Sequence, residues 1–194
     1  MEKLIAMLVP MLEGLGITLE VFIITLALSL PLGLMLALAR ISNCKPLSFI
    51  VETYIWLMRG TPLMLQLLFV YYALPSVGIK MSDMTAALLA FSLNYAAYFA
   101  EIYRGGIESI PKGQYEAAEV LGYSKVQTFW KIIFPQMVKR VLPPVTNEVI
   151  TLVKDTSLAF ALAYTEMFTL AKQVAAAQTT IMPLFIAGVF YYIF

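Results

Sequence analysis

The chain has 194 residues, of which 61% are hydrophobic and 13% charged, and its mean hydropathy is +0.83. Soluble domains carry charge on about 25% of their residues, so this composition is typical of an integral membrane protein. A net charge of +1, a single cysteine and no histidine exclude a basic nucleic-acid surface, an internal disulfide, histidine-dependent catalytic triads and H-E-x-x-H zinc sites.

The N-terminal part predicts a first membrane span. Apolar residues recur at helical spacing from Leu4 to Leu12, which indicates either a short amphipathic helix on the membrane surface or an extension of that span. Residues Ile17 to Ala39 are enough to cross the hydrocarbon layer of about 30 Å. No small-residue cleavage pattern is present in the first 16 residues, so we do not expect a removable signal peptide.

A second apolar stretch, Leu47 to Leu74, is interrupted by the sequence Arg59-Gly60-Thr61-Pro62. Thr61 can cap a helix and Pro62 can begin one, so we predict a discontinuous span whose second half starts inside the membrane. The free amides at that start would carry partial positive charge and face a substrate carboxylate. A proline kink that only shapes the helix bundle is the alternative, and the sequence leaves both open.

Two further spans carry polar side chains. The third is predicted from Met84 to about Tyr103 and the fourth from Val141 to about Tyr164. A charged side chain at mid-membrane costs at least about 2.5 kcal/mol, so the polar residues should face protein or water. Thr180 to Phe194 begins a fifth span that is too short to complete, and we expect the protein to continue beyond it.

The polar faces of the third and fourth spans are predicted to line one cavity. Helical spacing places the residues of each span on one face. For the amino-acid substrate that the family resemblance given below implies, the lysine would bind the α-carboxylate, one acidic residue would bind the α-ammonium, and the asparagine and tyrosine would orient the substrate. The alternative is that the lysine pairs with a neighbouring carboxylate only to hold the bundle together. The candidate substrate-pathway residues are Asn94, Tyr98, Glu101, Glu148, Lys154 and Asp155.

Residues 111–135 form a polar insert between the third and fourth spans. Good helix formers from Gln114 to Leu121 precede Gly122, which is expected to end a first helix as a C′ glycine. Ser124, with a glutamine three residues later, has the pattern of a capping box, so a second short helix should follow until Pro135 interrupts it.

This insert resembles the cytoplasmic EAA loop of ABC importer permeases, the segment that docks into the ATPase subunit. The resemblance rests on Glu116-Ala117-Ala118, Gly122, Ile132, Phe134 and Pro135, with phenylalanine 134 where the family usually has leucine. It makes Glu116, Ala117, Ala118 and Gly122 the candidate ATPase-coupling residues. A surface helix without a docking role is the alternative. The sequence R-G-T-P-L-M-L-Q, which begins at Arg59, resembles the R-G-T-P-L-x-x-Q signature of the polar amino-acid uptake branch of these permeases.

The predicted fold is an all-α integral membrane protein with five transmembrane helices, the last incomplete. Residues 1–194 would form a single permease domain, with the cytoplasmic coupling loop at 111–135. Eight lysines and arginines lie on the side of the insert and three on the opposite side. The positive-inside rule therefore places the insert in the cytoplasm and the N-terminus outside.

The resemblance implies the transmembrane subunit of an ABC importer that moves a polar or basic amino acid across the prokaryotic cytoplasmic membrane. It implies three partners: a second permease subunit, expected to be identical, a pair of P-loop ATPases, and an extracytoplasmic substrate-binding protein. This chain has no P-loop, so ATP and Mg would be bound by the ATPases, and it would bind no cofactor or metal and catalyse no reaction itself.

Two other functional classes are alternatives for this sequence. An ion-gradient-driven secondary transporter or channel would use the mid-membrane charges as an ion relay, although this would leave the polar insert without a role. An intramembrane enzyme is disfavoured, because the chain has no histidine and no serine beside an evident base.

Overall fold

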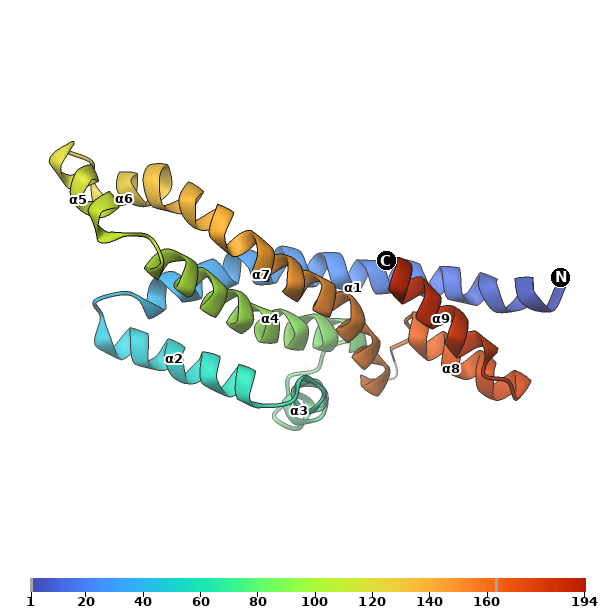
Figure 1. Ribbon diagram of the computed structural model, residues 1–194. Coiled ribbons are helices and arrows are strands. Elements are labelled where there is room, and N and C mark those ends of the chain that lie inside the picture. The colour runs from blue at the N-terminus through green and yellow to red at the C-terminus, as the bar shows by residue number, and fades with distance from the viewer. Residues whose placement is uncertain (1, 163) are drawn as a thin grey trace.

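The computed structural model describes residues 2–162 and 164–194, and these form a helical bundle with no β-strand (Figure 1). The longest helix, α1, is continuous over Glu2–Arg40. The N-terminal residues therefore extend the first span rather than forming a separate surface helix. Its apolar part, Met7–Arg40, has 34 residues. At 1.5 Å per residue it is about 50 Å long and exceeds the hydrocarbon layer.

Helices α2 (Lys45–Gly60) and α3 (Leu63–Ser76) meet at the predicted break, where the chain bends by 108°. Pro62 has the extended backbone that ends one helix and admits the next. The position of the break is thus confirmed. The predicted cap is wrong, because the Thr61 hydroxyl donates to the Leu57 carbonyl of α2 at 2.8 Å and does not cap α3. Within the described residues only α1 is long and apolar enough to cross a membrane alone, and α2 with α3 adds a second span if the bent pair is counted as one. The number of five spans stays a prediction.

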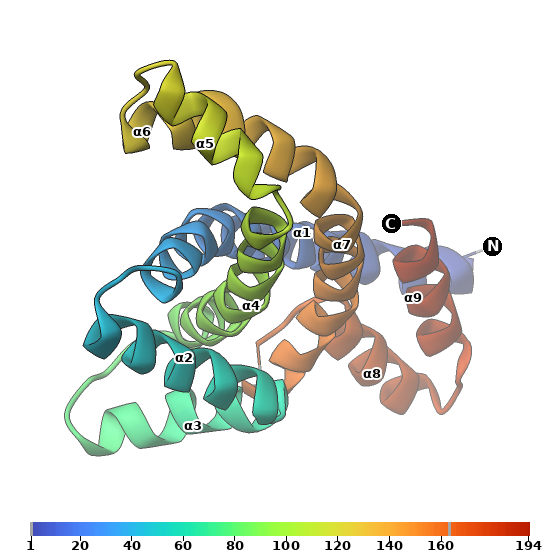
Figure 2. The ribbon, with the colours of Figure 1, turned by 60° about the vertical axis from the view of Figure 1, so that its left-hand side comes forward.

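Helix α4 (Asp83–Glu108) lies at the centre of the bundle and packs against α1, α2, α3 and α7 (Phe134–Asp155) (Figure 2). The Ser82 hydroxyl accepts a hydrogen bond from the Thr85 amide at 3.2 Å and caps its first turn. Close packing is possible because six alanines of α4 are buried. The predicted third span is confirmed as a helix and extends about five residues further at its C-terminal end.

Residues 111–135, which we call the coupling segment after their predicted role, project from the bundle at the end opposite to the N-terminus (Figure 1). Helix α5 (Lys112–Val120) ends as predicted at Gly122, whose φ of 76° is left-handed. The amides of Gly122 and Tyr123 donate back to Glu119 at 2.9 Å and Ala118 at 3.0 Å, which is the Schellman pattern. Helix α6 (Lys125–Thr128) begins with the predicted capping box.

The prediction that Pro135 interrupts the second helix of this segment is wrong. A π-helical turn, η1 (Phe129–Ile133), follows α6 directly and leads into α7 without a break. The Phe134 amide donates to the Phe129 carbonyl across this widened turn. Pro135 follows this widened turn directly, so the π-helical turn accommodates its missing N–H, and the proline marks a change of helix type and not an end.

The C-terminal part differs from the predicted fourth span. Helix α7 begins before Val141 and ends at Asp155, and a 3₁₀ segment, η2 (Thr156–Leu162), follows it. Two short helices come next, α8 (Met167–Gln178), which was not predicted, and α9 (Met182–Ile193), which lies within the predicted fifth span. They form a hairpin beside the N-terminal half of α1 (Figure 1), where Met11, Met167, Ala171 and Ala187 are buried together.

Candidate functional site

The break between α2 and α3 is held by two side-chain amides. The Gln66 Nε2 donates to the Met58 carbonyl at 2.9 Å and to the Thr61 hydroxyl at 2.7 Å. The Asn94 Nδ2 donates to the same Met58 carbonyl at 3.1 Å and to the Gln66 Oε1 at 2.9 Å. Carbonyls freed at a helix end need such partners when water is absent. The glutamine of the R-G-T-P-L-x-x-Q pattern therefore has a structural task that the sequence alone did not assign.

A cavity of about 200 Å³ lies between α3, α4 and α7. We call it the acidic pocket, because Glu148 and Asp155 are the charged side chains that line it. Four of the six predicted pathway residues surround it, so the structure brings the predicted faces of α4 and α7 together. Its lining residues are Leu63, Asn94, Tyr95, Tyr98, Glu148, Thr151 and Asp155.

Asp155 is fixed by a residue that sequence reasoning missed. The Tyr95 hydroxyl donates to the Asp155 Oδ2 at 2.7 Å across the α4 and α7 contact. Tyr95 is 2% exposed, and a buried tyrosine normally needs a partner for its hydroxyl. This need for a hydrogen-bond partner was the signal in the sequence that pointed to Tyr95. Its spacing of three residues from Tyr98 on α4 would have placed it near the predicted pathway.

Lys154 lies away from the acidic pocket. Its side chain is exposed, and it is absent from the lining of the pocket. Among the described residues it forms no ion pair with Asp155 or Glu148, so the alternative of a lysine and carboxylate pair that holds the bundle together is wrong for this arrangement. The pocket therefore has two carboxylates and no lysine in its wall.

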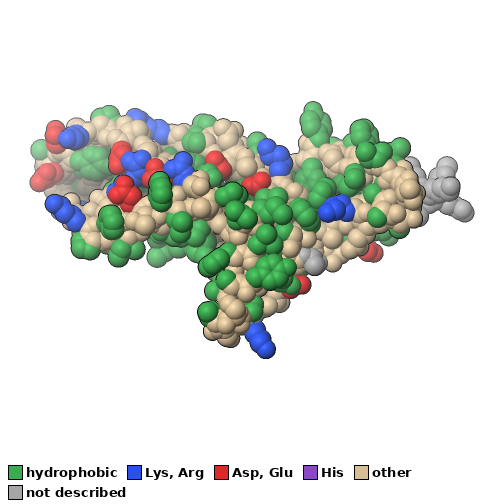
Figure 3. Space-filling model, turned by 90° about the horizontal axis from the view of Figure 1, so that it is seen from below, with side chains coloured by type: hydrophobic (Ala, Val, Ile, Leu, Met, Phe, Trp, Pro, Cys, Tyr) green, Lys and Arg blue, Asp and Glu red, His purple; other side chains and the backbone are tan. Residues whose placement is uncertain are grey.

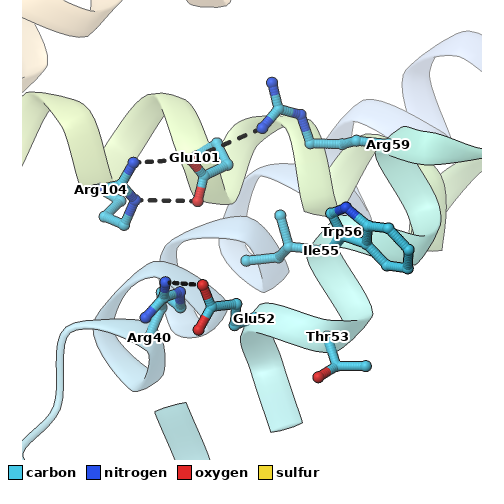
Figure 4. A pocket seen from close by; sticks show the side chains of 8 residues that line it. All are labelled: Arg40, Glu52, Thr53, Ile55, Trp56, Arg59, Glu101 and Arg104. Atoms are coloured by element: carbon cyan, nitrogen blue, oxygen red, sulfur yellow. Dashed lines mark hydrogen bonds and ion pairs between the residues drawn. The ribbon is translucent and has the colours of Figure 1, made fainter. Parts of the chain in front are cut away.

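Glu101 belongs to a second and larger cavity of about 550 Å³ (Figure 4). We call this cavity the charged cleft. It is lined by Arg40, Glu52, Thr53, Ile55, Trp56, Arg59, Glu101 and Arg104. Figure 3 shows acidic and basic side chains gathered on a face whose remaining side chains are largely apolar. Charges on such a face are expected to meet protein or water and not lipid.

Two tight ion pairs form opposite walls of the charged cleft. The Arg104 guanidinium donates to both Glu101 oxygens, at 3.0 and 2.9 Å, and to Glu108 at 2.6 Å. Across the cleft, an Arg40 Nη2 lies 2.6 Å from a Glu52 oxygen. The third arginine, Arg59, is held more loosely, with 3.7 Å between its Nη1 and the Glu101 Oε2.

The coupling segment presents a mixed surface. Glu116 and Ala117 are exposed on α5, whereas Ala118 is 1% exposed and packs within the segment. Close approach of a partner therefore concerns Ala117 rather than Ala118. Large apolar side chains surround these residues without cover, namely Val120, Leu121, Val126 and Trp130. Exposed apolar side chains of this density are typical of a protein interface.

Comparison with known proteins gives a consistent result. A family model described as binding-protein-dependent transport system inner membrane component matches residues 29–194. The arginine transport system permease protein ArtQ of Bacillus subtilis (strain 168) is 40% identical over 94% of this chain and 84% of the relative. The L-cystine transport system permease protein TcyB of the same organism is 37% identical over 94% of this chain and 79% of the relative.

A solved structure has the same fold. It is described as the crystal structure of an amino acid ABC transporter with histidines, and it superposes with a TM-score of 0.90 at 30% identity, covering 98% of this chain and 90% of that one. These matches confirm the predicted ABC importer permease of the polar amino-acid uptake family, and they identify the membrane component and not the ATPase. The chain therefore belongs to the family of binding-protein-dependent transport system inner membrane components.

Proposed function

We propose that this chain carries a polar or basic amino acid through the acidic pocket, driven by ATPases that dock on its coupling segment. The relatives are described as arginine and cystine permeases. Both of these substrates carry an α-ammonium and an α-carboxylate. The observation that carries the proposal is the convergence of Glu148, Asp155, Asn94 and Tyr98 on one pocket beside a broken helix.

Charge complementarity supports a cationic or zwitterionic substrate. Glu148 and Asp155 supply negative charge for an ammonium or a guanidinium, with charge-assisted hydrogen bonds. Leu63, the first residue of α3, also lines the pocket, so the positive end of the α3 dipole faces the same space. A site at a helix break near mid-membrane is a common arrangement in transporters. Lys154 remains a predicted pathway residue that would act only from outside this pocket.

The family implies an ATPase partner and a binding protein. We further propose two permease subunits, expected to be identical, and a pair of ATPases that bind ATP and Mg. Each permease is taken as one domain with the coupling segment inside it. Glu116, Ala117 and the apolar residues around them would meet the ATPase. ATP-driven closure of the ATPases would move the two coupling segments together and open the pocket outward.

The proposed orientation places the coupling segment in the cytoplasm and the N-terminus outside. Arg40 at the end of α1 lies at the same end of the bundle as the coupling segment (Figure 1). Arg104 in the last turns of α4 precedes the coupling segment directly. This clustering of basic residues at one end agrees with the positive-inside rule.

The test is ATP-dependent uptake of L-arginine and L-cystine into vesicles, with the ATPase and the binding protein supplied. Glu116→Lys is expected to abolish both uptake and co-purification of the ATPase, while the permease still inserts. Glu13→Lys, an equal change of charge at an exposed site near the other end of the molecule, is the matched control and should transport normally. Normal transport by Glu116→Lys, or uptake that does not depend on ATP, would contradict the proposal.

A further inference from the structure

Arg59 lies between the acidic pocket and the charged cleft. The acidic pocket and the charged cleft share no lining residue. Arg59 lines the cleft, yet its guanidinium carbon lies 5.4 Å from the ring centre of Tyr98, which lines the pocket. Figure 4 shows the Arg59 side chain extending from α2 toward Glu101 on α4. One guanidinium therefore contacts the walls of both cavities.

The contact between Arg59 and Glu101 is the weakest of the ion pairs in the cleft. Its 3.7 Å separation compares with 2.9 Å between Glu101 and Arg104, and 44% of the Arg59 side chain is exposed. Within the described residues the Arg59 guanidinium donates no hydrogen bond. Glu101 is already neutralised by Arg104, so Arg59 is the one arginine of the cleft wall without a close carboxylate.

The acidic pocket is lined by carboxylates and has no basic side chain in its described wall, whereas Arg59 is a basic side chain without a close carboxylate. The charged lining residues of the pocket are Glu148 and Asp155. The α-carboxylate of an amino acid in this pocket would lie near two negative charges, with only the partial positive charge at the start of α3 to offset them, which is unfavourable. Arg59 is a loosely held cation that is already in contact with Tyr98 at the edge of the pocket.

The backbone of Arg59 is fixed, so the side chain alone needs to move. Met58 accepts hydrogen bonds from both Gln66 and Asn94, and these bonds hold the last turn of α2 against α4. A long arginine side chain changes between rotamers readily, and one weak ion pair opposes that change. Glu101 would keep Arg104 as its partner when Arg59 leaves.

We propose that the substrate α-carboxylate replaces Glu101 as the partner of Arg59, so that this side chain turns from the charged cleft into the acidic pocket when substrate binds. The inference rests on the proposed function and names the residue that recognises the carboxylate. Arg59 thereby selects α-amino acids over amines of the same side chain. Its return to Glu101 accompanies release of the substrate.

The test measures binding to the intact importer in nanodiscs, with its ATPases and without the binding protein, by titration calorimetry. The probes are two matched pairs: L-arginine with agmatine, and L-cystine with cystamine. The second member of each pair lacks the α-carboxylate. Arg59→Gln is expected to weaken binding of the amino acid roughly tenfold or more and to leave binding of the amine unchanged, because only the amino acid loses a charge-assisted pair. Arg59→Lys should restore part of the loss.

The Glu101→Gln variant is expected to change the affinity for the amino acid in the opposite direction. Removing the competing carboxylate should tighten binding of the amino acid about two- to fivefold, the scale of a weak ion pair, with no change for the amine. A gain in affinity cannot arise from misfolding. Glu52→Gln removes a carboxylate from the same cleft without touching Arg59 and is the matched control, expected to change neither probe.

The outcomes separate this inference from the proposed function. If the wild-type importer binds neither amino acid, the pocket is not the substrate site and the exchange fails with it. If wild type binds an amino acid but Arg59→Gln changes the amino acid and the amine equally, the pocket stands and the exchange is wrong. Weaker amino-acid binding by Glu101→Gln would also overturn the exchange, since Glu101 would then be supporting substrate binding.

Discussion

The Asn94 side chain on α4 donates to the carbonyl oxygen of Met58 on α2 at 3.1 Å, across 36 residues of sequence. Asn94 is 3% exposed, and the carbonyl that it reaches is one of those left free where α2 stops. The same residue lines the acidic pocket. A single amide thus stabilises the helix break and forms part of the proposed substrate site, so the shape of the pocket depends on the break.

We expect Asn94→Ala to lower the free energy of unfolding by about 1 kcal/mol, because the Gln66 Oε1 loses its donor and Met58 loses one of two. Denaturant titration of the purified permease in detergent measures this. Thr53→Ala is the control, since among the described residues that exposed hydroxyl bonds only to the Phe49 carbonyl in its own helix. Equal losses in the two variants would show that Asn94 does not support the break.

Gly122 controls the direction of the coupling segment. Its φ of +76° strains any residue with a Cβ, although the space around it is open. Gly122→Ala should therefore cost about 1 kcal/mol locally and weaken co-purification of the ATPase, because α5 would end with a different geometry. Gly113→Ala, also in open space but inside α5, should keep ATPase binding and slightly favour the helix. The prediction fails if the two variants bind the ATPase alike.

Gly33 sets the distance between α1 and α4. A Cβ at this position would lie 2.7 Å from the Phe99 Cβ and 3.1 Å from the Ala96 carbonyl oxygen, and atoms so near a helix backbone cannot move aside easily. Gly33→Ala should destabilise the permease by roughly 1–3 kcal/mol. Gly16→Ala lies in the same helix with nothing within 4 Å, and it should be neutral or slightly stabilising. Thermal unfolding of both variants in detergent provides the comparison.

The sequence predicted local structure correctly where a residue type has a fixed backbone preference. The helix break at Pro62, the left-handed Gly122 and the capping box at Ser124 all follow from residue types with fixed backbone preferences. The shared face of Asn94 and Tyr98 followed from helical spacing, and both residues line the pocket. Each of these features can be predicted from a few residues that are close together in the sequence.

Three expectations differ from the structure for reasons that residue types and regular helical spacing do not show. Pro135 does not end a helix because a π-helical turn absorbs its missing amide, and nothing in the sequence marks that turn. Helical spacing predicted that Glu101 lies on the same face as Asn94. Glu101 is about two turns further along α4, however, and it lines a different cavity. Lys154 lies beside Asp155 in sequence and is still outside the pocket, because neighbouring residues on a helix point about 100° apart.

Helix α8 was missed because its start depends on a side chain that the sequence does not mark as a cap. Glu166 is 0% exposed and accepts four hydrogen bonds. They come from the amides of Phe168 and Thr169, both at 2.7 Å, the Thr169 hydroxyl at 2.9 Å, and the Tyr191 hydroxyl at 3.1 Å. One carboxylate therefore caps α8 and ties it to α9.

This geometry predicts a graded loss of stability. Tyr191→Phe removes one donor from an otherwise satisfied carboxylate and should cost about 0.5–1.5 kcal/mol. Glu166→Ala leaves two backbone amides at the start of α8 without a partner in a buried site, and it should cost about 2–4 kcal/mol. In the double variant the tyrosine change should add almost nothing, because its partner is already gone. Denaturant titration of the three variants measures this coupling, and additive losses would show that Tyr191 and Glu166 act independently.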